Sequence, residues 1–138
     1  MKEEKIDIET AEKEFDRFGE GMDLDFDIGK MDDEDKNAFN KHKNRIISSI
    51  QKGHLVINQN DEAEYTPFRP GSKHKEAIIF HERTGASLMA QDGKKKNADV
   101  AKTYAVMGDM CKVAPKVFAG LAGADIKTCE AIFALLMD

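Results

Sequence analysis

The segment MDDEDKNAFNKHKNRIISSIQKG at residues 31–53, followed by HLVINQNDEAEYTPF at 54–68, decides the fold class. Its first part predicts a helix over about 33–52, because acidic residues gather at the start and Gly53 stands at the end. Two β-prone runs separated by the turn-rich QNDE then predict a hairpin. A helix followed directly by a hairpin indicates an α+β fold.

The chain after the hairpin is expected to add one strand and then only helices. EAIIFHER at 76–83 predicts the strand, with Ile78 and Phe80 on one face. Four later runs predict helices around a polar DGKKKN loop: GASLMAQ, ADVAKTYAVMGDMCKV, APKVFAGLAG and DIKTCEAIFALLMD, the last capped by Asp125. We therefore expect a short antiparallel sheet, a hairpin plus a third strand, packed with four or five helices, and an all-helical C-terminal half.

The N-terminal residues differ in composition from the rest. Residues 1–40 hold 15 acidic and 6 basic residues, whereas residues 41–138 hold 11 acidic and 15 basic ones. Residues 1–31 also have few large apolar side chains, so they are expected to bury too little surface to offset the entropy of ordering. The sequence thus predicts an acidic, largely disordered arm over 1–31 and a single α+β domain over 32–138.

One part of this acidic region has the spacing of a calcium loop. Asp23, Asp25, Asp27 and Glu34 fall at positions 1, 3, 5 and 12 of an EF-hand loop. However, Ile28 stands at position 6, where the turn requires glycine, and Lys30 replaces the usual aliphatic residue. We therefore favour a solvated acidic segment and keep calcium binding as a weak alternative.

No catalytic or cofactor-binding pattern is present. The four histidines are not spaced as zinc ligands, and neither Cys111 nor Cys129 lies beside a base in the sequence. The two cysteines lie in apolar surroundings, which favours buried reduced thiols over a disulfide. We expect a protein that is not an enzyme and that needs no metal or cofactor.

Three basic clusters, KHKNR at 41–45, KHK at 73–75 and GKKK at 93–96, make a nucleic-acid-binding protein the alternative function. The formal net charge of −5 and the scarcity of interleaved aromatic residues favour a solvated surface instead. Nucleic acid is therefore not an expected partner. The sequence shows neither a signal peptide nor a run long enough for a membrane span, so a cytoplasmic protein is expected.

The last 22 residues are rich in large apolar side chains. Such a segment forms either the core or a docking face, and core is the favoured interpretation. Leu135 and Met137 are expected to lie outside the main apolar stripe and to favour an additional contact with a partner or a second copy. The predicted partner-binding residues are Val117, Phe118, Leu121, Ile132, Phe133, Leu135, Leu136 and Met137.

The second half of the chain, from Tyr65 to Asp138, resembles the tail assembly chaperones of long-tailed bacteriophages, especially the contractile-tailed, Mu-like type. The resemblance rests on a Pro-containing strand, a strand leading into a polar helix start, a small-residue helix, a Gly-containing turn before an acid, and a final helix. The matching segments are EYTPFRP, IIFHERTGASLMAQ, DVAKTYAVMGDMCKV, KVFAGLAGADI and CEAIFALLMD.

The resemblance implies an assembly chaperone or scaffold that acts in the cytoplasm of the bacterial host. Such proteins bind the tape-measure protein or tail-tube subunits, keep them soluble and are absent from the finished virion. An apolar docking helix and a charged arm suit that role, and a homo-oligomer is possible in it.

Overall fold

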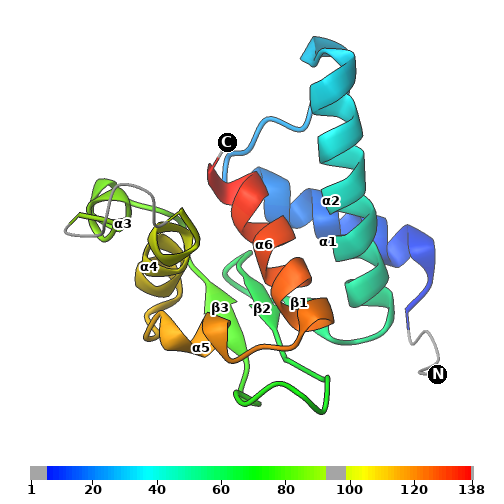
Figure 1. Ribbon diagram of the computed structural model, residues 1–138. Coiled ribbons are helices and arrows are strands. Elements are labelled where there is room, and N and C mark those ends of the chain that lie inside the picture. The colour runs from blue at the N-terminus through cyan, green and yellow to red at the C-terminus, as the bar shows by residue number, and fades with distance from the viewer. Residues whose placement is uncertain (1–5, 93–98, 138) are drawn as a thin grey trace.

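The computed structural model describes residues 6–92 and 99–137 and has an α+β architecture (Figure 1). Within these residues, helices surround a small three-stranded sheet. Their bounds are α1 (Ile8–Gly21), a 3-10 turn η1 (Ile28–Lys30), α2 (Asp33–Gln51), β1 (Leu55–Ile57), β2 (Ala63–Tyr65), β3 (Ile78–Phe80), α3 (Gly85–Met89), α4 (Asp99–Cys111), α5 (Lys116–Ala119) and α6 (Gly123–Met137).

The sheet has the predicted composition, a hairpin plus a third strand in the order β1-β2-β3, and both pairings are antiparallel. Tyr65 in the central strand pairs with Leu55 on one side and Ile78 on the other. All three side chains are fully buried, because alternate residues of each short strand face the helices. The polar DGKKKN loop expected after α3 lies mostly at 93–97, outside the described residues.

Helix α2 confirms the prediction for residues 33–52 to within one residue. Asp32 is its N-cap, and the Asp32 carboxylate accepts a hydrogen bond of 2.8 Å from the Asp35 N–H. Phe39, Ile46 and Ile50 are buried, which shows that the apolar spacing in the sequence marks the face that meets the core.

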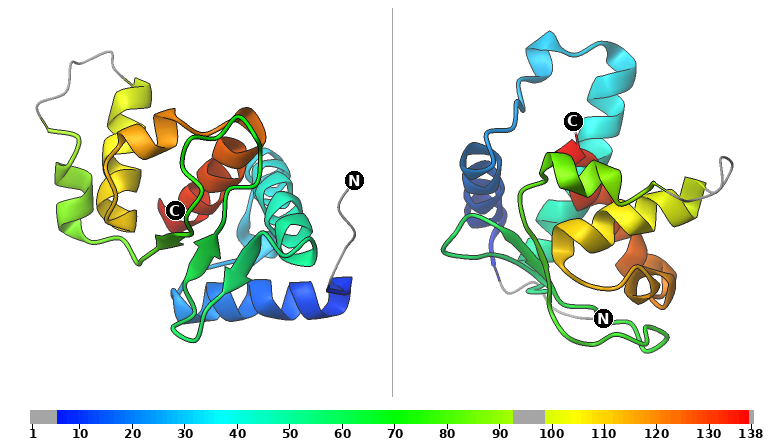
Figure 2. Two further views of the ribbon diagram at one scale, coloured as in Figure 1. Left: turned by 90° about the horizontal axis from the view of Figure 1, so that it is seen from below. Right: turned by 90° about the vertical axis from the view of Figure 1, so that its left-hand side faces the viewer.

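Helix α6 lies between α2 on one side and the α4–α5 pair on the other (Figures 1 and 2). A helix covered on two sides needs more than one apolar stripe. This explains why the end of the chain is so apolar and places α6 at the centre of the core.

The prediction of a disordered arm over residues 1–31 is wrong for the part that the structure describes. Residues 8–21 form α1, which lies across α2 and the hairpin (Figure 2). Phe15 and Phe18 are each 1% exposed. The Phe15 ring stacks on Phe26 with centroids 4.8 Å apart, and Phe39 of α2 closes the cluster. The local composition is poor in apolar residues, but this long-range aromatic cluster supplies the missing burial.

Arg17 attaches α1 to the far end of the hairpin. Its guanidinium donates to the Asp61 carboxylate at 2.8 Å and to the backbone carbonyls of Ile57 and Asn58 at 2.6 and 2.8 Å. The same group forms an ion pair with Glu14 one turn earlier in the helix. One side chain thereby satisfies acceptors from both the helix and the turn.

Candidate functional site

The predicted partner-binding residues are mostly core residues. Leu135 is 2% exposed, so the expectation that it makes an additional contact with a partner is wrong. The neighbours of α6 on two sides account for its burial. The other buried members are Phe118, Leu121, Ile132 and Leu136, while Val117, Phe133 and Met137 are half-buried and pack against the core.

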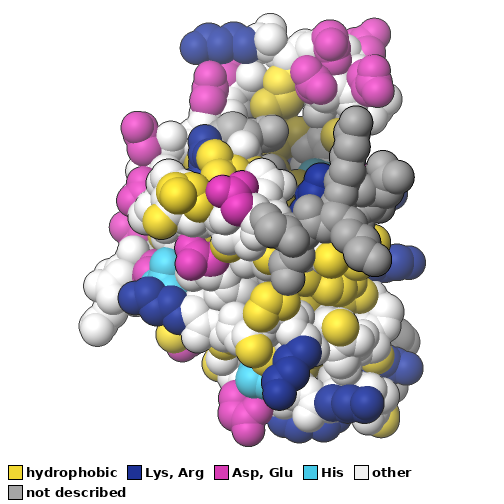
Figure 3. All heavy atoms as spheres, turned by 60° about the vertical axis from the view of Figure 1, so that its left-hand side comes forward, with side chains coloured by type: hydrophobic (Ala, Val, Ile, Leu, Met, Phe, Trp, Pro, Cys, Tyr) yellow, Lys and Arg dark blue, Asp and Glu magenta, His cyan; other side chains and the backbone are white. Residues whose placement is uncertain are grey.

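Phe133 and Met137 nevertheless reach a surface hollow of about 250 Å³ between α3, α4 and α6. Leu88 of α3, which is 37% exposed, and Val106 of α4 line the same hollow. The polar residues Gln91, Asp99, Lys102 and Thr103 complete its lining. Met89 and Val100 are exposed on the two helices that border it, at 66% and 64%. Figure 3 views the molecule with the α3–α4 side turned forward, where hydrophobic side chains reach the surface among charged ones. We call this site the apolar hollow.

Local sequence fixes the short helix α3 at the edge of the apolar hollow. Thr84 is its N-cap, and the Thr84 hydroxyl accepts a hydrogen bond of 3.3 Å from the Ser87 N–H. The Ser87 hydroxyl accepts one of 3.1 Å from the Thr84 N–H in return. This reciprocal capping holds the first turn and therefore the position of Leu88.

A buried carboxylate organises the opposite end of α6. Asp125 is fully buried in the first turn of that helix, which begins at Gly123, two residues before the predicted cap. Its carboxylate accepts hydrogen bonds from the hydroxyls of Tyr65 and Ser72, at 2.6 and 2.5 Å. The backbone N–H groups of Phe68 and Arg69 donate to it at 3.1 Å each. The prediction that Asp125 caps this helix is therefore wrong: its carboxylate fastens the loop 66–77 to the helix.

These contacts determine the protonation states of Asp125 and Tyr65. Burial alone raises the pKa of Asp125, but the hydrogen bonds from Ser72, Tyr65 and the two backbone N–H groups outweigh it and hold the pKa below 3.8. Burial, together with the hydrogen bond to Asp125, raises the pKa of the Tyr65 hydroxyl. At neutral pH a carboxylate thus accepts from a neutral phenol, which suits a structural anchor.

A second hollow, of about 460 Å³, lies between α2, the start of α6 and the loop 66–77. Lys41 and Arg45 of α2 line it with polar neighbours, together with Lys52, the C-cap of that helix. Phe68 lies at its edge, 44% exposed, and its ring stacks flat on buried His54 with centroids 3.9 Å apart. We call this site the basic hollow. The other lining residues are Asn44, Ser48, Ser49, Ala124 and Thr128.

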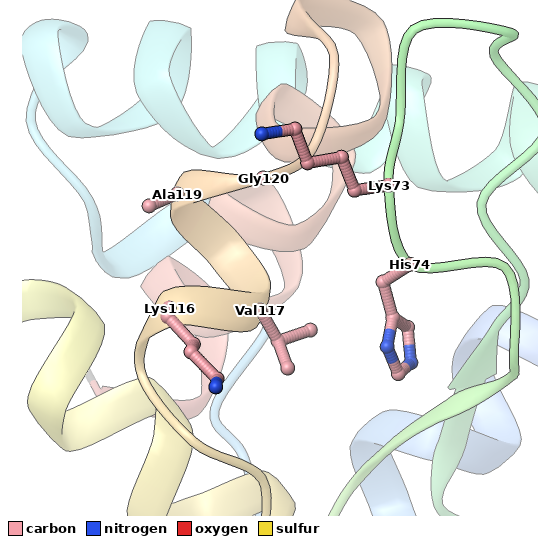
Figure 4. A pocket seen from close by; sticks show the side chains of 6 residues that line it. All are labelled: Lys73, His74, Lys116, Val117, Ala119 and Gly120. Carbon is pink, nitrogen blue, oxygen red and sulfur yellow. The ribbon is translucent and has the colours of Figure 1, made fainter.

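A third hollow, of about 440 Å³, lies between α5 and the loop 66–77 (Figure 4). His74 from the loop and Val117 from α5 point toward each other across it, and Lys73 and Lys116 stand at its rim. The buried Nε2 of His74 has no hydrogen-bond partner among the described residues. The His74 Nδ1 atom lies 3.6 Å from the exposed carboxylate of Glu76.

Two of the four carboxylates of the candidate calcium loop, those of Asp25 and Asp27, are used in local turns. The Asp25 and Asp27 side chains accept hydrogen bonds from the N–H groups of Asp27 and Gly29, and Asp23 adopts a positive φ of 55°. Glu34 lies in the first turn of α2. Within residues 6–92 and 99–137, no three histidine, cysteine or acidic side chains gather in a way that could hold a metal ion.

The three basic clusters of the sequence do not form one common surface among the described residues. In KHKNR, Lys41 and Arg45 face the basic hollow, whereas Lys43 lies over the Phe15 ring at 5.6 Å. KHK contributes Lys73 and His74 to the third hollow. GKKK at 93–96 lies outside the described residues. Lys52 and Phe68 belong to none of these clusters; the signal for Lys52 was its seven-residue distance from Arg45, about two helical turns along α2.

Comparison of the chain with protein-family models, with curated proteins and with solved structures returned no match. The resemblance of residues 65–138 to tail assembly chaperones therefore stays a prediction. In the described part of the chain, no helix combines the length and the apolar content that a membrane span requires.

Proposed function

We propose that the chain is an assembly chaperone for a phage-tail structural protein, either a tape-measure protein or a tail-tube subunit. One observation carries the proposal: Leu88, Phe133 and Met137 gather around the apolar hollow, with exposed Met89 and Val100 beside it. The resemblance over residues 65–138 names the kind of client. Action in the bacterial cytoplasm is part of the same proposal.

The physical argument concerns clustering. Single exposed apolar residues are ordinary, but exposed apolar side chains that gather around a hollow mark sites of protein association. A hollow bordered by three helices offers a place for an apolar side chain or an amphipathic helix of the client. The net charge of −5 favours solubility of the resulting complex.

Co-expression with a tail-tube subunit or tape-measure protein from the same genome tests the proposal. We expect the chain to raise the soluble fraction of the client and to co-purify with it. The paired substitutions Leu88→Ser and Val100→Ser should abolish both effects, because they make the border of the apolar hollow polar while leaving the core intact.

The matched control is Val56→Ser, since Val56 is 51% exposed but lies on β1, away from the apolar hollow. It should retain client binding. A Leu88/Val100 double variant that binds its client as well as the native chain would refute the apolar hollow as the docking site. A second copy of the chain is the alternative occupant; sedimentation of the purified chain, with and without the double substitution, would reveal it.

A further inference from the structure

The basic hollow combines a line of positive charge with an exposed aromatic ring. Lys41 and Arg45 are four residues apart on α2, about 6 Å along the helix axis, and Lys52 lies about 10 Å further on. The three cations therefore follow the length of the hollow instead of meeting at one point. Asn44 and Ser48 add polar groups between them.

The aromatic ring is held in place from two directions. The Phe68 ring lies parallel to the His54 ring, at 5° between planes, and His54 is only 5% exposed. The N–H of Phe68 donates to buried Asp125 at 3.1 Å. The Arg69 guanidinium also lies over the Phe68 ring, 6.0 Å from its centroid, so a base that stacks on the exposed part of this ring also meets Arg69. An exposed phenylalanine with a stacked support and an anchored backbone forms a preorganised platform for a planar group.

Negative charge near the site is already compensated. Asp125 lies beneath the loop that carries Phe68, but four donors surround its carboxylate. No aspartate or glutamate is among the residues that line the basic hollow in the described part of the chain. Lys41 and Arg45 are exposed. The Arg45 guanidinium donates a long hydrogen bond of 3.5 Å to the Thr128 hydroxyl, which it gives up when it turns toward an anion.

We propose that the basic hollow binds single-stranded nucleic acid, with one base stacked on Phe68 and successive phosphates contacted by Lys41, Arg45 and Lys52. A positively charged groove beside an aromatic platform is the arrangement by which proteins hold single strands without reading their sequence. A duplex fits the arrangement less well, since its bases are already stacked on one another. This site is separate from the apolar hollow, and the proposal does not depend on the chaperone function.

Fluorescence anisotropy with labelled oligo-dT and oligo-U of about twelve nucleotides tests the proposal on the full chain. We expect salt-sensitive binding with a Kd of about 1–100 μM, the range of non-specific association. Phe68→Ala should weaken binding about fivefold or more, while Phe68→Tyr retains it, because stacking needs only the ring. Binding of either oligonucleotide supports the proposal, and the tighter one indicates whether DNA or RNA is preferred.

The contribution of positive charge is tested with the double variant Lys41→Gln and Arg45→Gln. Losing two phosphate contacts should reduce the slope of log K against log salt by about 1.4, whereas Phe68→Ala should leave that slope unchanged. Lys112→Gln is the matched control, since Lys112 is exposed and does not line the hollow. Circular dichroism of each variant verifies the fold.

Three outcomes would overturn the proposal. The first is no salt-sensitive binding of either oligonucleotide at about 100 μM protein and low salt. The second is equal affinity of the native chain and of Phe68→Ala for the oligonucleotide, because the Phe68 ring would then contribute nothing to binding. The third is tighter binding of poly-glutamate than of either oligonucleotide at equal charge concentration, which would identify the basic hollow as a surface for acidic peptides.

Discussion

Ser72 links Asp125 to the backbone of Ala122. The Ser72 hydroxyl donates to the Asp125 carboxylate at 2.5 Å and accepts a hydrogen bond of 2.8 Å from the Ala122 N–H. The loop 66–77 and the first turn of α6 are therefore joined through one hydroxyl. Since Tyr65 of β2 donates to the same carboxylate, the sheet, the loop and the helix share a single polar junction.

The first prediction concerns this junction. Asp125→Asn keeps the size of the side chain but removes its charge and one acceptor oxygen, so a buried donor loses its partner. We expect the free energy of unfolding to fall by about 2–3 kcal/mol. Denaturant unfolding measures it, with exposed Asp109→Asn as a control that should change the free energy by less than about 0.5 kcal/mol. Equal effects of the two substitutions would show that the junction contributes nothing to stability.

A second prediction follows from the lowered pKa of Asp125. Because the folded pKa lies below the ordinary value of 3.8, the carboxylate stabilises the fold above that pH, and this stabilisation is lost as the pH falls through the folded pKa. The difference in unfolding free energy between the native chain and Asp125→Asn should stay constant from about pH 8 to pH 5 and shrink below about pH 4. A difference that grows on acidification would contradict the assignment.

The third prediction tests the N-terminal helix. Phe15→Ala should lower the free energy of unfolding by about 3–5 kcal/mol, because the ring is buried between Phe26 and Phe39. Ile8→Ala, on the same helix but at a side chain 54% exposed, should cost about 0.5 kcal/mol or less. Amide hydrogen exchange provides an independent check. Rapid exchange throughout residues 8–21 in the native chain would support the original prediction of a disordered N-terminal arm.

The fourth prediction concerns the two thiols, which are buried and unbonded to each other. Burial raises the pKa of both Cys111 and Cys129, so little thiolate forms at pH 8. Alkylation by iodoacetamide, followed by mass spectrometry, should be slow in the native chain and rapid in denaturant. Modification of either cysteine at the same rate in both conditions would mean that its thiol is accessible in the fold.

Most elements of the fold could be predicted from local signals in the sequence. Acidic capping residues and Gly53 marked α2, and alternation with a polar turn marked the hairpin. The core role of α1 was missed because Phe15 gains its burial from Phe39, which belongs to another helix. No window of residues 1–31 contains that information.

The sites were harder to predict because each draws on distant segments. The basic hollow needs Arg45, His54 and Phe68 together, and only the helical spacing of Lys41, Arg45 and Lys52 was visible locally. Met137 was singled out as apolar at the chain end, but the apolar hollow also requires Leu88 of α3. Asp125 has the sequence signature of a helix cap, and its role as an anchor depends on a loop more than 50 residues earlier.

The bond between Tyr65 and Asp125 spans 60 residues and has a consequence for biosynthesis. The ribosome completes the sheet and the loop 66–77 long before α6 leaves the exit tunnel. Until then the nascent chain exposes the face of α2 that α6 later covers, and the Tyr65 hydroxyl lacks its acceptor on Asp125. We expect polypeptides that stop before residue 123 to be degraded rapidly, because the centre of their core has not been synthesised.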